Sequence, residues 1–115
     1  MENLSFGAAL EVAKAGGRIA RQGWNSKGMF VFMRPAHELH ISVVVEAEKS
    51  LPQSVKDYYA QDVTDEKGVR NYPADKNDTV KFTAYLCMKA ADGTIVNGWI
   101  ASQTDMLSND WTILE

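Results

Sequence analysis

The stretch Val80-Lys81-Phe82-Thr83-Ala84-Tyr85-Leu86-Cys87-Met88 is followed by the pair Asp92-Gly93 and by a second apolar stretch, Ile95-Val96 with Trp99-Ile100. The first stretch starts with alternating apolar and polar side chains, which is the pattern of a half-buried β-strand. An Asp-Gly pair between two such stretches is a strong signal for a tight turn. We therefore predict an antiparallel hairpin here, in a fold that contains a sheet.

The N-terminal region predicts a helix followed by a second hairpin. Ser5 can cap a helix whose apolar residues recur at helical spacing over residues 6–13, and Gly16-Gly17 ends it. Residues 18–21 alternate charged and apolar side chains like a strand, and turn-forming residues separate them from the apolar run 29–33. Because five consecutive apolar residues cannot all face one side of a strand, both faces of this run need cover, from the helix and a loop or from another subunit.

The middle of the chain carries weaker patterns. The β-branched residues within 40–45 predict a strand. Residues 50–60 predict a helix with Pro52 in its first turn. Residues 61–79 contain very few apolar side chains, which predicts a long surface loop.

The C-terminal end completes the predicted fold class. Thr104 can cap a short helical turn, and residues 111–113 predict a final strand. Together the patterns predict an α+β fold in a single domain over residues 1–115. We expect a mostly antiparallel sheet packed on one longer N-terminal helix, with one or two short helices elsewhere.

Composition indicates a soluble globular protein. The chain has 115 residues, of which 45% are hydrophobic and 23% charged, and this is enough for one core and too little for two. A net charge of −3 argues against binding to long nucleic acid or to a membrane by electrostatics alone, although a pocket with a few cations can hold a small anion. Cys87 has no second cysteine to pair with, and we find neither a signal peptide nor an apolar run that could span a bilayer. We therefore expect a cytoplasmic protein.

Residues typical of catalytic and metal centres are scarce. His37-Glu38 and His40 lack the spacing of a helical zinc motif, and the chain has no further histidine to complete a site. Ser102 lacks the Gly-x-Ser-x-Gly context of a hydrolase nucleophile, and the glycines match neither the dinucleotide fingerprint nor the phosphate loop. We therefore predict no catalytic residue, no metal site and no cofactor.

Two segments carry residues suited to binding a nucleotide. Trp24, at the tip of the predicted N-terminal hairpin, can stack on a purine, and Arg18, Arg21 and Lys27 lie close in sequence to meet phosphate. Residues 99–111 concentrate short polar side chains that can bind ribose hydroxyls or the edge of a base. Both segments also have a purely structural interpretation, because a tryptophan can cover the core from a loop and short polar residues commonly form turns and helix caps.

Three blocks of the sequence are similar to one known family. The blocks are Phe6-Gly7-Ala8-Ala9-Leu10 with Ile19-Ala20-Arg21-Gln22-Gly23-Trp24-Asn25-Ser26-Lys27-Gly28-Met29, then residues 81–93, then residues 99–111. They resemble the second described family of phage Thoeris anti-defence proteins, long known only as a domain of unknown function. The resemblance implies a homotetramer, not an enzyme, that sequesters a cyclic ADP-ribose isomer (glyco-cyclic ADP-ribose) in the cytoplasm of the infected bacterial cell. Some members also bind cyclic di- or trinucleotides at a separate site.

Taken residue by residue, the resemblance implies a binding site built from both ends of the chain. Trp24 would stack on the base, with Arg21 and Asn25 beside it. The other implied contacts are polar and come from the C-terminal third of the chain: Asn97, Gln103, Thr104, Asp105 and Asn109.

Two other hypotheses stay open. The chain could inhibit a host defence enzyme or effector by binding it directly through residues 29–33 and the acidic residues within 62–78, and it would then have no affinity for small molecules. It could also cleave or modify a nucleotide, with Asp105 or Asp110 as a general base beside a metal ion, and it would then show turnover.

Overall fold

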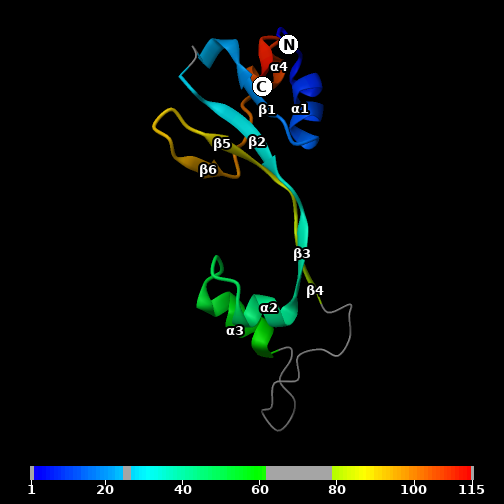
Figure 1. Cartoon of the computed structure of the whole chain (residues 1–115), viewed down its shortest axis with the longest axis vertical. Coiled ribbons are helices and arrows are strands. Elements are labelled where there is room, and N and C mark those ends of the chain that lie inside the picture. Colours follow the sequence, from blue (N-terminus) through cyan, green and yellow to red (C-terminus); the bar gives the residue numbers. More distant parts are fainter. Residues whose placement is uncertain (1, 25–26, 62–78, 115) are drawn as a thin grey trace. The chain divides into compact units, whose positions relative to one another are not determined.

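The computed structural model describes residues 2–24, 27–61 and 79–114 (Figure 1). The chain divides into two compact units, residues 1–35 with 84–115 and residues 36–83. That residues 1–115 act together as one nucleotide-sequestering domain stays a prediction. In the described ranges, no helix is long and apolar enough to cross a membrane.

The first unit is built on a five-stranded antiparallel sheet with the strand order β6-β5-β2-β1-β7. The strands are β1 (Arg18–Arg21), β2 (Phe30–Arg34), β5 (Tyr85–Lys89), β6 (Ile95–Asn97) and β7 (Trp111–Leu114), and the short helix α4 (Gln103–Leu107) precedes β7. β1 and β2 form the predicted N-terminal hairpin, with Ile19 opposite Val31. β5 and β6 form the hairpin predicted around Asp92-Gly93. Both hairpins and the mostly antiparallel α+β class are confirmed.

Helix α1 (Phe6–Lys14) packs on the sheet of this unit. It begins as predicted, because the Ser5 hydroxyl accepts a hydrogen bond at 3.2 Å from a backbone N–H of the first turn. Gly16 follows the end of the helix with a φ of 101°, in the left-handed region that favours glycine. Ala9 and Ala13 are fully buried in the core of the unit. Their small side chains let the helix backbone approach the sheet closely.

The end of α1 offers a test of this packing. A β-carbon on Gly17 would lie 2.6 Å from Cγ1 of Val12 and 3.2 Å from its carbonyl oxygen. We therefore expect Gly17→Ala to lower the free energy of unfolding by about 1–3 kcal/mol, the usual cost of overpacking. Gly7→Ala is the matched control, since only Ser5 Oγ lies within 4.0 Å of that β-carbon, and we expect a gain of up to about 1 kcal/mol. Urea unfolding measures both variants, and equal stabilities would contradict the tight packing.

The second unit consists of a two-stranded antiparallel ribbon and two helices. The strands are β3 (His37–His40) and β4 (Thr79–Phe82), and the helices α2 (Ile41–Glu46) and α3 (Gln53–Gln61) follow β3. Ile41, Val44 and Ala60 are buried where the two helices pack together. Helix α3 confirms the helix predicted over residues 50–60, with Pro52 directly before its first residue. Residues 62–78 of the predicted long loop lie outside the described residues.

The strand predicted over residues 40–45 is wrong, because all but the first of these residues form α2. His40 ends β3 and then caps the helix, since the backbone N–H of Ser42 donates to His40 Nδ1 at 3.2 Å. The helix buries Ile41 and Val44, which are three residues apart and lie on one helical face. Packing within this unit therefore outweighs the strand preference of the β-branched side chains.

Three smaller predictions are also corrected. The strand predicted over residues 80–88 is two strands, because β4 ends at Phe82 and β5 begins at Tyr85 in a different sheet. Alternation alone did not reveal this break, since Thr83-Ala84 continues the pattern. Ile100 lies outside the strands and is 87% exposed. The N-terminal helix is not the longer one, because α1 and α3 both span nine residues.

Candidate functional site

Trp24 ends a short 3-10 turn, residues Gln22–Trp24, that directly follows β1. Its ring meets the rings of Trp111 and Trp99 edge-on, with centroids 5.4 Å and 6.3 Å apart. Trp111 is fully buried, whereas Trp24 is half-buried. Trp24 therefore combines both interpretations of the sequence, since it packs against the core and keeps part of its surface available to a ligand.

A cavity of about 340 Å³ lies beside Trp24. Its volume is within the range of about 300–1,000 Å³ that is usual for small-molecule pockets. Its walls come from the N-terminus, β1, the segment after β1, and β7: Glu2, Ala20, Arg21, Gln22, Trp24, Lys27, Gly28, Met29, Thr112 and Leu114. An aromatic ring and a lysine thus line the same space, which suits a ligand that has both a flat base and a negative charge.

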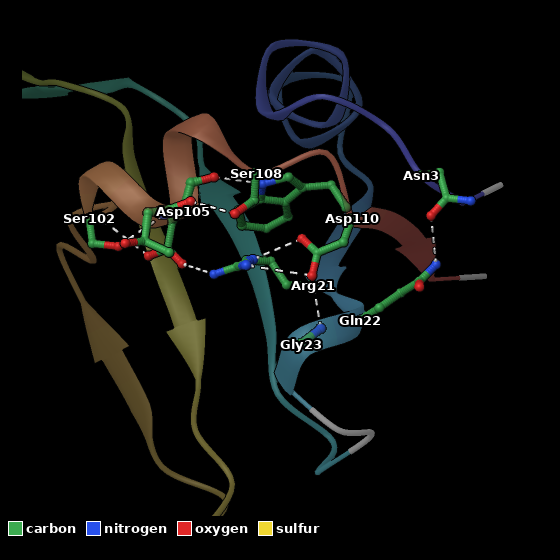
Figure 2. Close-up of polar contacts among 10 residues, drawn as sticks. Asn3, Arg21, Gln22, Gly23, Ser102, Asp105, Ser108 and Asp110 are labelled. Atoms are coloured by element: carbon green, nitrogen blue, oxygen red, sulfur yellow. Dashed lines mark hydrogen bonds and ion pairs between the residues drawn. The ribbon is translucent and has the colours of Figure 1, made fainter.

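Arg21 is held by two carboxylates (Figure 2). Its Nε donates to Asp110 Oδ1 and its Nη1 donates to Asp105 Oδ1, each at 2.9 Å. The side chains of Arg21 and Asp105 are only 16% and 14% exposed, so their attraction is screened less than that of an ion pair on the open surface. The guanidinium that was predicted to meet phosphate is therefore already engaged by the protein.

Asp105 links Arg21 to the start of α4 and to the core. Its backbone N–H donates to Ser102 Oγ, and its Oδ2 accepts from the Ser102 N–H, each at 3.0 Å (Figure 2). This capping box makes Ser102 the cap of α4, and the prediction that Thr104 caps it is wrong. The carbonyl oxygen of Asp105 also accepts a hydrogen bond from Trp111 Nε1 at 2.9 Å.

The hydrogen bonds around Arg21 favour the charged forms of Arg21, Asp105 and Asp110. The hydrogen bond from Arg21 lowers the pKa of Asp110, and the bond from the Gly23 N–H adds to this effect. Burial acts to raise the pKa of Asp105, but the hydrogen bonds from Ser102 and Arg21 outweigh it and leave that pKa lowered. The bond to Asp110 raises the pKa of Arg21. A carboxylate with a lowered pKa is a weak base, which disfavours the enzymatic hypothesis for these two aspartates.

These shifts predict a loss of stability in acid. A carboxyl group whose pKa in the folded protein lies below its unfolded value, about 3.9 for aspartate, contributes its full stability above that value and loses it as the pH falls through the folded pKa. We therefore expect the free energy of unfolding to fall below about pH 4, and to fall less steeply in Asp110→Asn. Urea unfolding between about pH 7 and pH 3 measures both slopes. Parallel slopes would contradict this role of the Asp110 carboxylate.

The structure brings together only part of the predicted site. Trp24 and Arg21 line the cavity, and Asp105 joins them through its ion pair with Arg21. Five other predicted residues are exposed and do not line the cavity: Arg18 in β1, Asn97 in β6, Gln103 and Thr104 in α4, and Asn109 before β7. The predicted contact Asn25 lies outside the described residues.

Seven cavity residues were not predicted from the sequence as ligand contacts: Glu2, Ala20, Gln22, Gly28, Met29, Thr112 and Leu114. Thr112 and Leu114 alternate with the buried Trp111 along β7, so they share the opposite face of the sheet. β7 pairs with β1 so that Ala20 lies opposite Thr112. Alternation could have placed Thr112 and Leu114 on one face, but it could not reveal a pairing between the two ends of the chain.

Residues 4–114 match the model of the Thoeris anti-defense 2-like domain. The chain belongs to this family. The protein named Thoeris anti-defense 2 of Bacillus phage SP01 is 31% identical to it over 111 residues, which cover 96% of this chain and 94% of that protein. Membership of the Thoeris anti-defense 2-like family confirms the resemblance found in the three sequence blocks. The match also runs through the middle of the chain, which those blocks did not cover.

Proposed function

We propose that this protein inhibits Thoeris immunity by binding glyco-cyclic ADP-ribose and holding it intact in the cytoplasm of the infected cell. The observation that carries the proposal is the cavity beside Trp24, which Lys27 also lines, in a member of a Thoeris anti-defense family. A cyclic ADP-ribose isomer presents an adenine, two riboses and a pyrophosphate. Such a ligand needs a stacking surface, hydrogen-bonding groups and a cation.

Each part of this ligand has a matching group at the cavity. Trp24 stacks on the adenine, an interaction worth about 1–3 kcal/mol. The Lys27 ammonium pairs with the pyrophosphate, and the Gln22 amide and the Thr112 hydroxyl bond to ribose hydroxyls. None of these roles needs a catalytic group, because sequestration requires only affinity and enough binding sites to outnumber the signal.

The exposed polar residues that do not line the cavity of their own chain contact the ligand bound to a second subunit. The resemblance implies a homotetramer, in which the surface that carries Asn97, Gln103, Thr104 and Asn109 can meet the cavity of a neighbouring chain. Asn25 follows Trp24 directly and completes the proposed contacts. A separate site for cyclic di- or trinucleotides is a further part of what the resemblance implies.

Release of unchanged ligand tests this function. The purified protein is mixed with the product pool of a Thoeris TIR-domain enzyme and separated by filtration, and the protein fraction is then denatured by heat. Mass spectrometry of both fractions should detect depletion of the cyclic ADP-ribose isomer before heating and return of the same mass afterwards. A parallel mixture with cyclic di- and trinucleotides tests the separate site.

Two other outcomes would point to the alternatives. Depletion with a changed mass would mean that the protein is an enzyme, and no depletion would favour direct inhibition of a host protein. One surface expected for that inhibition is not an open one, because residues 29–33 lie mostly in β2, between β1 and β5, where Val31 is fully buried and Phe32 half-buried. The other expected surface, within residues 62–78, lies outside the described residues.

A further inference from the structure

We propose that Arg21 and Asp110 are positioning residues, which hold the Gln22–Trp24 turn and thereby set the ring of Trp24 at the cavity. Arg21 would then act on the ligand through Trp24 and not as a phosphate contact. This inference rests on the proposed function of the cavity. It is carried by the hydrogen bonds around Asp110, the close approach of Gly23, and the charge balance at Arg21.

Asp110 holds three consecutive residues immediately before Trp24. Its Oδ1 accepts from Arg21 Nε at 2.9 Å, and its Oδ2 accepts from the Gly23 N–H at 3.0 Å (Figure 2). Its backbone carbonyl accepts from the Gln22 N–H at 3.0 Å. One residue therefore fixes the path of the chain from β1 into the Gln22–Trp24 turn. That residue is 87 positions from Gly23 and 89 positions from Arg21 in the sequence.

Gly23 shows how closely the turn approaches this carboxylate. A β-carbon at residue 23 would lie 3.1 Å from Asp110 Oδ2 and 3.6 Å from an Nη atom of Arg21. The first distance is shorter than an ordinary van der Waals contact, so a β-carbon here would move the carboxylate by a few tenths of an ångström. The glycine thus permits the contact between turn and carboxylate.

The two aspartates that bind Arg21 are also connected, through their backbones, to the ring that packs against Trp24. Asp110 directly precedes Trp111, and the Asp105 carbonyl accepts the hydrogen bond of Trp111 Nε1. The Trp111 ring in turn meets Trp24 edge-on. Arg21 therefore links Asp110, which holds the backbone before Trp24, to Asp105, which holds the ring of Trp111.

The charges around Arg21 make it a poor phosphate contact. One guanidinium faces two carboxylates, so the three groups together carry a net negative charge, which repels an anionic ligand. Its Nε and Nη1 both donate to these carboxylates at 2.9 Å. Lys27 lines the same cavity and is exposed, so it is better placed to meet phosphate.

Whether Asp110→Asn binds the ligand more weakly or more tightly than the wild type distinguishes a positioning role of Arg21 from direct contact with the ligand. The variant removes a negative charge close to the cavity, so simple electrostatics predicts tighter binding of an anionic ligand. Positioning predicts weaker binding of glyco-cyclic ADP-ribose, by about tenfold, the factor that losing a charge-assisted hydrogen bond corresponds to. Arg21→Lys should weaken binding similarly, because a lysine cannot hold two carboxylates with a planar fork. Asp57→Asn, at an exposed position of α3 in the other unit, is the matched charge control.

Gly23→Ala tests the same geometry without changing any charge. We expect weaker binding than in the wild type, because the new methyl group displaces the Asp110 carboxylate. This variant decides the question if Asp110→Asn fails to fold. The near-ultraviolet circular dichroism of the three tryptophans gives a readout independent of the ligand. This spectrum should change in Asp110→Asn, Arg21→Lys and Gly23→Ala, whereas their far-ultraviolet spectra should match that of the wild type. Both spectra of the control Asp57→Asn should be unchanged.

Each result decides the inference. Wild-type or tighter binding in Asp110→Asn, together with weaker binding in Arg21→Lys, would overturn it and make Arg21 a ligand contact. If the wild type itself does not bind glyco-cyclic ADP-ribose, the proposed function fails, and the tryptophan spectra then decide positioning alone. Unchanged spectra in folded Asp110→Asn and Gly23→Ala would overturn the positioning role.

Discussion

Replacing Trp24 with alanine is expected to weaken binding of glyco-cyclic ADP-ribose by about 5- to 150-fold, which is the factor that corresponds to about 1–3 kcal/mol of stacking. The ring of Trp24 lines the cavity and is half-buried. Alanine leaves the other cavity residues in place but removes the flat surface on which a base can lie. Isothermal titration at neutral pH measures the change.

The variant also needs a measure of folding, because Trp24 packs edge-on against Trp111 and Trp99. Loss of these ring contacts is expected to cost about 0.5–1.5 kcal/mol for each pair. Urea unfolding shows whether the variant is folded under the conditions of the titration. Trp24→Phe keeps a smaller ring and should bind with intermediate affinity.

A matched aromatic control separates stacking from a general loss of apolar surface. Tyr58 lies in α3 of the other unit and is 60% exposed. Tyr58→Ala should bind as the wild type does. Binding of Trp24→Ala within about twofold of the wild type would refute the stacking role.

Replacing Trp111 with alanine is expected to have the largest effect on stability, a loss of about 3–5 kcal/mol. Trp111 is fully buried, its ring centroid lies 5.2 Å from that of Phe6, and its Nε1 donates to the Asp105 carbonyl at 2.9 Å. The variant leaves a cavity in the core and removes the partner of a carbonyl group. Since domains are stable by only about 5–15 kcal/mol, the variant should be close to unfolding at physiological temperature.

Two further variants calibrate this result. Trp111→Phe keeps an aromatic ring in the core but loses the hydrogen bond, so it should lose less stability than Trp111→Ala. Ile100→Ala removes a side chain from a residue that is 87% exposed and should change stability by no more than about 0.5 kcal/mol. A loss below about 1 kcal/mol in Trp111→Ala, measured by urea unfolding, would show that the ring does not anchor the core.

Local signals predicted the elements whose physical causes lie within a few residues. The Ser5 cap and Gly16 fix the two ends of α1, and the pair Asp92-Gly93 joins β5 to β6. Each depends on hydrogen bonds or backbone angles between near neighbours, so it can be read from a short window of sequence.

The error at residues 40–45 arose where tertiary packing competes with local preference. The β-branched residues after His40 favour a strand, but a histidine cap and burial of Ile41 and Val44 favour α2. That choice is not visible from propensity, because it depends on which groups the folded chain buries. The cap of α4 is a different case: Ser102 and Asp105 are three residues apart and form a local capping box, so the spacing itself could have indicated Ser102 in place of Thr104.

The sequence by itself determined the family, the antiparallel α+β class and the importance of Trp24 as a candidate for stacking. Only the tertiary structure decided which residues surround Trp24 and which groups Arg21 binds. Arg21 has the chemistry of a phosphate contact, yet Asp105 and Asp110 reach it from 84 and 89 positions away and occupy its guanidinium. The cavity likewise depends on β7 pairing with β1. Local sequence fixes what a side chain can bind, whereas long-range pairing fixes which partner it meets.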